Sequence, residues 1–142
     1  MEIETTRDFK RPRAAVLSKF RDPERLESVM SGMSIKAERR ALPPSAAWDC
    51  SIVWRNELRR FAATLVETAP DETMVLGFTS DLADSSINMD FYDLPDGGCR
   101  VIAKGTVTAH TIMAKLALQS MRLLSGKAEQ RISKLIHNIG RP

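Results

Sequence analysis

Few residues of this chain could do chemistry, and their spacing matches no common catalytic or metal-binding motif. His110 and His137 lie 27 positions apart without a neighbouring His or Cys, whereas zinc sites group such ligands closely. Cys50 is expected on a buried strand face and Cys99 at an exposed strand start, and neither has a context that would make its thiol nucleophilic. The sequence also lacks a nucleophile elbow and a strand-to-helix glycine loop for phosphate. We therefore expect no metal, no cofactor and no catalytic residue.

Acid–base or anion-binding chemistry would need polar groups that converge in a cavity, and four side chains are candidates. Asp90 and Tyr92 alternate with apolar residues in a strand pattern, which places both on the solvated face. Arg39 shares the inward register and would suit a carboxylate or phosphate head group at a cavity mouth. The alternative for Arg39 is an exposed strand end. His110 is the fourth candidate.

Charge is distributed unevenly along the chain, although the net charge is only +3. Residues 61–99 contain eight acidic residues and no Lys or Arg, whereas residues 110–142 are rich in basic residues. Such a basic segment could meet nucleic acid or anionic lipid, or acidic hairpins could fold beside it and partly cancel its charge. Because no aromatic platform accompanies the basic residues, we favour the second interpretation and expect no nucleic-acid partner.

The length of 142 residues predicts one domain over 1–142. No run of residues approaches the roughly 20 apolar positions of a membrane span. The charged, alternating N-terminal stretch does not have the pattern of a secretory signal peptide. Two cysteines are too few for a disulfide framework. We therefore expect a cytoplasmic protein with no integral membrane association.

Hydrophobic periodicity predicts the elements that must position any site. Seven segments alternate apolar and polar residues, which is typical of strands with one buried face. Asp22-Pro23 separates two short helices, because Asp caps a helix and Pro fits its first position. The run 95–98 (Pro-Asp-Gly-Gly) predicts a hairpin. The expected strands are 2–9, 34–42, 46–54, 58–68, 73–80, 85–94 and 99–109, and a long helix is expected over 111–139.

Two features of these elements bear on the shape of the sheet and the last helix. Gly77 and Gly105 lie inside strands, where glycine often marks a bend, so the sheet should be strongly curved. The apolar stripe of helix 111–139 drifts around the axis after Ser125-Gly126, where we expect a kink or a change of packing partner. The register of strands 34–42 and 58–68 stays open.

This order of elements resembles the START-like, or SRPBCC, superfamily, which includes pollen-allergen-like proteins, polyketide cyclases and aromatases, and lipid-transfer domains. The resemblance rests on the break at residues 22–26 (Asp-Pro-Glu-Arg-Leu), the strand-turn series from Trp48 to Val107 and the helix opening at Thr111. It implies an α+β helix-grip fold, in which a curved antiparallel sheet of about seven strands wraps around a long C-terminal helix and two short helices follow the first strand. The fold alone implies no single function.

The resemblance implies a cavity between sheet and helix that often takes a hydrophobic ligand. From the residues alone, an apolar sheet face against an apolar helix could equally be a closed core. Together they favour non-catalytic binding or transport of a lipid, quinone or polyketide-like molecule. The expected lining is a set of apolar strand and helix positions with one basic residue: Ile52, Trp54, Phe61, Leu76, Phe78, Ile87, Met89, Phe91, Val101, Met113, Leu116, Leu124 and Arg39.

Two other functions stay open at this point. An enzyme of the cyclase, aromatase or hydrolase kind would use the same cavity, with Arg39, Asp90, Tyr92 and His110 as its candidate groups. A structural module could instead form a homodimer through its acidic and basic surfaces, with a small cavity or none.

Overall fold

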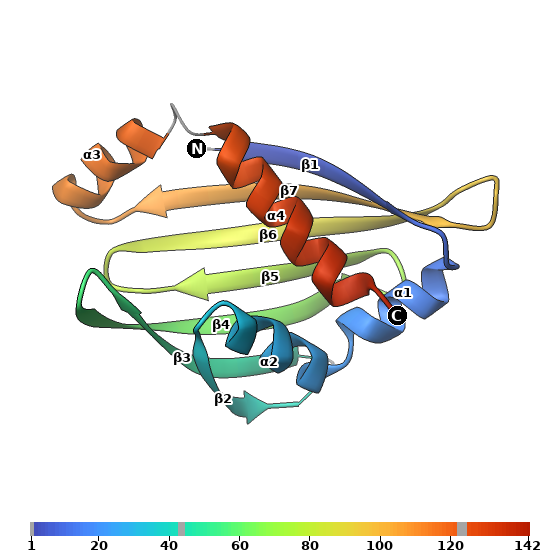
Figure 1. Cartoon of the computed structure of the whole chain (residues 1–142), viewed down its shortest axis with the longest axis horizontal. Coiled ribbons are helices and arrows are strands. Elements are labelled where there is room, and N and C mark those ends of the chain that lie inside the picture. Colours follow the sequence, from blue (N-terminus) through green and yellow to red (C-terminus); the bar gives the residue numbers. More distant parts are fainter. Residues whose placement is uncertain (1, 43–44, 122–124) are drawn as a thin grey trace.

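Figure 1 shows the computed structural model, which describes residues 2–42, 45–121 and 125–142. The alternating segments form strands, and the two helices after the first strand form where they were expected. The strands are β1 (Glu2–Phe9), β2 (Lys36–Ala41), β3 (Ser45–Trp54), β4 (Glu57–Ala69), β5 (Thr73–Thr79), β6 (Ala83–Asp93) and β7 (Cys99–Ala109). The helices are α1 (Arg13–Phe20), α2 (Pro23–Gly32), α3 (Ile112–Met121) and α4 (Ser125–Gly140).

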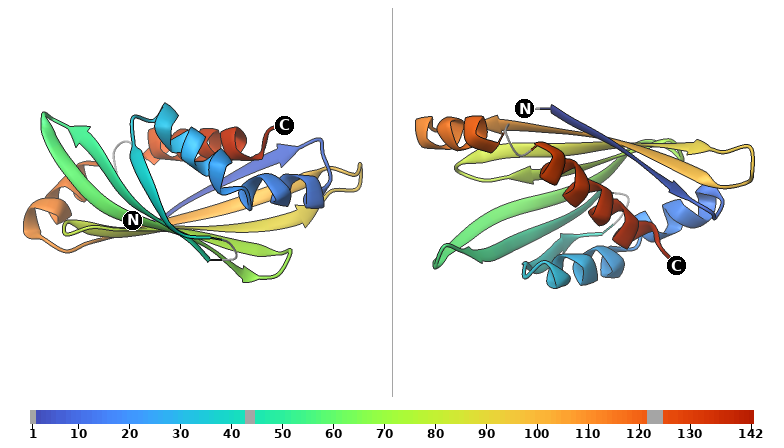
Figure 2. Two further views of the ribbon diagram at one scale, coloured as in Figure 1. Left: turned by 90° about the horizontal axis from the view of Figure 1, so that it is seen from below. Right: turned by 45° about the horizontal axis from the view of Figure 1, so that its top comes forward.

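The strands form one antiparallel sheet in the order β1-β7-β6-β5-β4-β3-β2. The sheet curves, and α1, α2 and α4 all lie on its concave face (Figure 2). This arrangement confirms the expected seven-stranded, curved α+β sheet with a C-terminal helix on one face. The side chain of Asp22 accepts a hydrogen bond from the Glu24 backbone N–H at 3.0 Å, which confirms the predicted cap of α2.

Strand pairing settles the register that the sequence left open. Trp48 of β3 pairs with Ala63 of β4, and Arg39 of β2 pairs with Trp48. Residues directly opposite in an antiparallel pair project to the same face of the sheet. The concave face of β4 therefore carries Phe61, Ala63 and Leu65, in line with the apolar positions of β5, β6 and β7.

The hydrophobic core lies between the concave face of the sheet and α1, α2 and α4. Ile136 and Ile139 of α4 are fully buried, as is Phe20 of α1. A Cβ atom on Gly105 of β7 would lie 3.1 Å from the Ile132 side chain, so this glycine leaves room for α4 to approach the sheet closely.

The predicted single helix over 111–139 is wrong: two separate helices, α3 and α4, occupy this segment. α3 begins beyond the end of β7 and turns back beside that end of the strand, whereas α4 crosses the concave face (Figure 1). The expected kink at Ser125-Gly126 falls where α4 is first described, directly after residues that lie outside the described part of the chain. Thr111 caps α3 as expected, because its hydroxyl accepts a hydrogen bond from the Ala114 N–H at 3.0 Å.

A carboxylate clamp ties α2 to the edge of the sheet. Arg39 donates two hydrogen bonds of 2.7 Å to the two carboxylate oxygens of Glu27, and the Trp48 indole N–H donates a third at 2.9 Å. The Arg39 guanidinium, together with the indole, holds the pKa of Glu27 below its usual range. The clamp therefore depends on an ionised Glu27.

We expect Gly140→Ala to lower the free energy of unfolding, because a Cβ atom at Gly140 would lie 2.5 Å from the Phe9 ring and 3.2 Å from the Phe20 ring. Overpacking of this kind typically costs about 1–3 kcal/mol. The control is Gly126→Ala near the start of the same helix, where a Cβ atom would meet nothing within 4 Å and alanine's higher helix propensity stabilises. Urea unfolding of both variants measures the effect. A Gly140→Ala protein as stable as Gly126→Ala would contradict this packing.

We expect the Glu27 clamp to make stability sensitive to acid. Because the folded-state pKa of Glu27 lies below the unfolded value of about 4.3, the clamp contributes fully above that pH. Its contribution is lost as pH falls through the lowered folded-state value. Urea unfolding at several pH values, followed by Trp48 fluorescence in a Trp54→Phe background, should show a shallower acid dependence for Glu27→Gln than for the parent. Identical acid dependence would show that the clamp adds no pH-linked stability.

Candidate functional site

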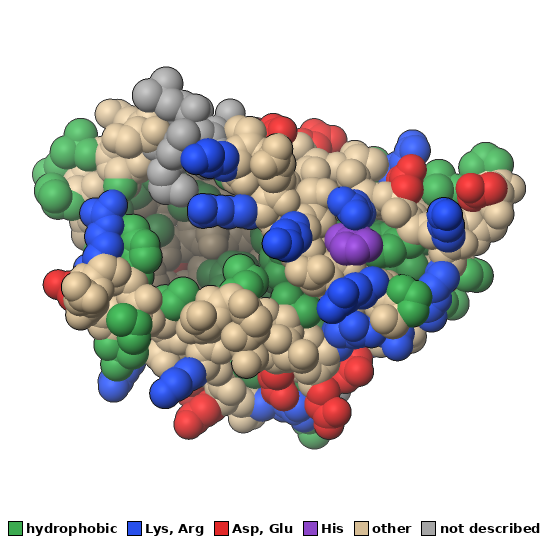
Figure 3. Space-filling view, in the orientation of Figure 1, with side chains coloured by type: hydrophobic (Ala, Val, Ile, Leu, Met, Phe, Trp, Pro, Cys, Tyr) green, Lys and Arg blue, Asp and Glu red, His purple; other side chains and the backbone are tan. Residues whose placement is uncertain are grey.

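A hollow opens at one end of the concave face, beyond the part that α4 covers. The antiparallel order brings the β3–β4 turn, the β5–β6 turn and the end of β7 to this same end (Figure 1). The space-filling view shows the depression between α3, α4 and the β3–β4 hairpin (Figure 3). We call it the larger hollow; its volume is about 740 Å³. It is lined by Trp54, Leu58, Arg59, Arg60, Phe61, Phe78, Thr79, Ser80, Asp81, Leu82, Ala83, Ser85 and Val107.

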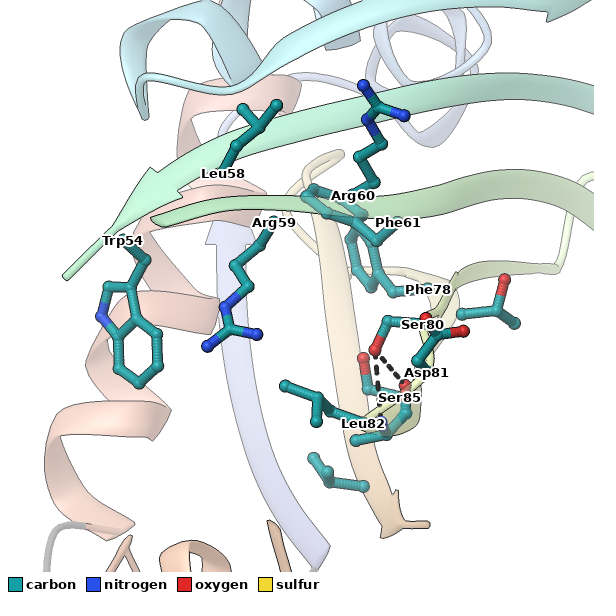
Figure 4. A pocket seen from close by; sticks show the side chains of 13 residues that line it. Trp54, Leu58, Arg59, Arg60, Phe61, Phe78, Ser80, Asp81, Leu82 and Ser85 are labelled. Carbon is teal, nitrogen blue, oxygen red and sulfur yellow. Dashed lines mark hydrogen bonds between the residues drawn. The ribbon is translucent and has the colours of Figure 1, made fainter. Parts of the chain in front are cut away.

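The wall of the larger hollow is largely aromatic and aliphatic (Figure 4). Phe61 and Phe78 meet edge to face with ring centroids 6.0 Å apart, and both are only partly buried. Trp54 is 53% exposed, and the Arg55 guanidinium stacks over its ring at 4.5 Å. The aromatic surface is therefore presented to the hollow instead of being closed off in the core.

Two polar groups of the larger hollow, those of Ser80 and Arg59, are held by neighbours. The Ser80 hydroxyl donates to the Ala83 carbonyl at 2.9 Å and accepts from the Ala83 N–H at 3.2 Å, which shapes the β5–β6 turn. Arg59 forms an ion pair of 2.6 Å with Glu57. Arg59 and Arg60 extend in opposite directions from β4 (Figure 4). The hollow therefore combines an apolar wall with a few polar groups, which is the usual composition of a ligand site.

A smaller hollow of about 270 Å³ lies beside the first, between α4 and the sheet. The two share Phe78, Ser85 and Val107 as lining residues, so they adjoin. The remaining lining of the smaller hollow comes from β1, β6, β7 and α4: Ile3, Ser86, Ile87, Gly105, Thr106, Lys127, Ala128, Arg131 and Ile132. Lys and Arg side chains stand along the edge of the depression (Figure 3).

The end of the molecule that holds the hollows also exposes large apolar side chains. Seven of the ten such side chains exposed in the described part of the chain lie there. Exposed apolar side chains that group together on a surface often mark an interaction or binding region. The seven are Val53, Trp54, Leu58, Leu82, Ile112, Met113 and Leu116.

The structure places the sequence-predicted lining residues in three groups. Trp54, Phe61 and Phe78 line the larger hollow, and Ile87 lines the smaller one. Ile52 lies half-buried one inward position before Trp54 on β3. The buried core takes Leu76, Met89, Phe91 and Val101.

The predicted helical residues do not join this lining. Met113 and Leu116 are 76% and 54% exposed on α3 and line neither hollow. Both were expected to face the sheet as part of one long helix, and the separation of α3 from α4 moves them away. Leu124 lies outside the described residues. Arg39 is engaged by Glu27 and lies outside both hollows.

The other catalytic candidates, Asp90, His110 and Tyr92, do not line the hollows, and Asp90 and His110 contact polar neighbours. Asp90 accepts hydrogen bonds from Thr73 at 2.7 Å and from Asn88 at 3.3 Å. His110 lies 3.1 Å from Asp84. Tyr92 is 49% exposed, as its outward register predicts. Neither hollow has any of these candidates among its lining residues.

Both cysteines are buried, which makes their thiols poor nucleophiles. Cys99 is fully buried in the hydrophobic core, so the expectation of an exposed thiol is wrong. Burial raises the pKa of Cys99 to about 11, and burial also raises the pKa of Cys50. Across residues 2–42, 45–121 and 125–142, no group of three or more His, Cys, Asp or Glu side chains is placed to hold a metal ion.

Part of the lining was not predicted from the sequence. Leu82, Ser85 and Arg59 line the larger hollow, and Lys127 and Arg131 line the smaller one. Strand register offered a signal for Ser85, because it pairs with Phe78 and therefore shares its face. The basic residues of α4 gave no such signal, since their direction depends on where the helix starts and how it crosses the sheet.

Comparison with known proteins identifies the fold. No family model matches the sequence, and no curated protein matches it. A crystal structure of a protein from Thermus thermophilus has a TM-score of 0.71 at 16% identity, covering 99% of this chain and 94% of that one. Ara h 8.0201 has a TM-score of 0.63 at 10% identity, covering 99% and 95%. The Zhui aromatase/cyclase of a Streptomyces species has a TM-score of 0.67 at 9% identity, covering 99% and 92%.

These likenesses span nearly the whole chain, although their low identities carry no statement about activity. In the described part of the chain, none of the helices has the length and apolar character that crossing a membrane requires. The chain has an α+β helix-grip fold, which it shares with the proteins of these solved structures.

Proposed function

We propose that this protein binds a hydrophobic small molecule in the larger hollow and carries or senses it without chemical change. The observation that supports the proposal best is an accessible space of about 740 Å³ with an aromatic wall. Ligand pockets typically enclose about 300–1,000 Å³. The partly exposed rings of Trp54, Phe61 and Phe78 would gain free energy by contact with an apolar ligand.

The arrangement of helices supports the same proposal. A long helix over the whole concave face would fill this end of the sheet with side chains. α3 instead leaves the sheet at the end of β7, and α4 covers the other end. Exposed apolar side chains also gather at this end of the molecule, as is common at binding regions.

A non-catalytic role is favoured over a cyclase or hydrolase by the polar groups of the hollow. The Ser80 hydroxyl is used in the β5–β6 turn, and Arg59 is paired with Glu57. The candidates Asp90, Tyr92 and His110 lie elsewhere. General acid–base catalysis needs a positioned acid or base within hydrogen-bond reach of the substrate. The likeness to an aromatase/cyclase therefore supports a shared fold and not a shared reaction.

Binding of the neutral hydrophobic dye Nile red tests the proposal. We expect saturable binding with a rise in dye fluorescence as the dye enters the apolar hollow. Phe78→Ser should weaken binding at least about tenfold, because a lost aromatic contact is worth about 1.5–3 kcal/mol. Trp54→Ala should weaken binding less, since its ring already lies half in solvent.

The matched control is Leu42→Ser, which removes an exposed apolar side chain at the end of β2, outside both hollows. Circular dichroism would verify that each variant remains folded. Unchanged affinity in folded Phe78→Ser and Trp54→Ala proteins would place the dye elsewhere and contradict the proposal, as would the absence of saturable binding to the parent.

A further inference from the structure

The two hollows differ in the charge that borders them. Lys127 and Arg131 line the smaller hollow from α4, one turn of the helix apart. Arg59 and Arg60 are lining residues of the larger hollow, as is the acidic residue Asp81. These two arginines extend in opposite directions from β4, and Arg59 is paired with Glu57 (Figure 4).

The charged groups of Lys127 and Arg131 are available to bind a ligand. Among the described residues, neither the Lys127 ammonium nor the Arg131 guanidinium has a hydrogen-bond or ion-pair partner. Other arginines of this protein do have carboxylate partners: Arg39 binds Glu27, and Arg21 binds Glu67 at 2.8 Å. The α4 pair is left with its charge directed to solvent and to the hollow.

The apolar residues beside these cations indicate what kind of molecule would satisfy both. Ile87 and Ile132 line the smaller hollow together with Lys127 and Arg131, and Phe78 and Val107 continue the apolar wall into the larger hollow. A molecule that spans the two would have an apolar body and a negative end. Ionised acceptors make shorter and stronger hydrogen bonds to Lys and Arg than neutral ones do.

We propose that the ligand is an anionic amphiphile whose carboxylate or phosphate head group binds Lys127 and Arg131 while its apolar body lies against Phe78 and Val107. This inference rests on the proposed function, since it names the class of molecule that the same cavity takes.

Competition against bound Nile red tests the head group directly. The competitors are dodecanoate, dodecyl phosphate and dodecanol, which share one alkyl chain and differ in the charge of the head. We expect at least one of the anions to displace the dye about tenfold or more tightly than the alcohol, a difference of about 1.4 kcal/mol. Lys127→Gln/Arg131→Gln should abolish that preference, because it weakens binding of the two anions far more than binding of dodecanol.

The matched control is Lys134→Gln/Arg141→Gln, which removes the same charge from the same C-terminal region outside both hollows. It should keep the preference for anions. Equal displacement by alcohol and anions, or an equal loss of preference in both double variants, would overturn the head-group inference and leave the proposed function standing. Failure of Nile red and all three competitors to bind the parent would overturn both.

Discussion

The packing of α4 across the concave face of the sheet is the interaction on which the rest of this structure depends. Ile136 and Ile139 are buried against the core, and Gly140 lies close to the rings of Phe9 and Phe20. Burial of each isoleucine contributes about 1.5–3 kcal/mol relative to exposure. Without α4 the apolar face of β1 and β7 would lie open to water, and α1 and α2 would lose the surface on which they pack.

The same packing determines where the sheet stays uncovered. The fully buried residues of α4 lie in its C-terminal half, whereas Lys127 and Arg131 in its N-terminal half are exposed at the edge of a hollow. α3 leaves the end of β7 without returning to the concave face. One end of the sheet is therefore a packed core, and the other end is an open apolar surface bordered by positive charge. The packed end stabilises the fold, and the open end is where we propose that the ligand binds.

Most of the fold could be predicted from the sequence because its signals are local. Alternation of apolar and polar residues identified all seven strands, and Asp22-Pro23 marked the junction of two helices. The pairing of Phe78 with Ser85 follows from the hairpin between them, so the inward direction of the polar Ser85 could also have been predicted. These features depend on short-range geometry that the residue types carry themselves.

The site was less predictable because it depends on packing between distant segments. The sequence indicated a kink or a change of packing partner at Ser125-Gly126, but the different directions of α3 and α4 depend on packing that the sequence pattern does not carry. As a result, Met113 and Leu116 were assigned to a wall from which they are absent. Arg39 has the inward register expected of a residue that binds a ligand's anionic group, but it is instead hydrogen-bonded to Glu27 of α2. The partner of a charged side chain is a property of the assembled fold.

The chain's two tryptophans offer the most direct test of the claim that ligand occupies the open end of the sheet. Trp54 lines the larger hollow, whereas the buried Trp48 donates its indole N–H to Glu27. Two-dimensional ¹⁵N–¹H spectra recorded during a dodecanoate titration would report both indole signals at once. If dodecanoate binds at the open end of the sheet, the chemical shift of the Trp54 indole should change saturably and that of the Trp48 indole should stay nearly unchanged. A larger shift at Trp48, or no shift at either ring on saturation, would contradict it.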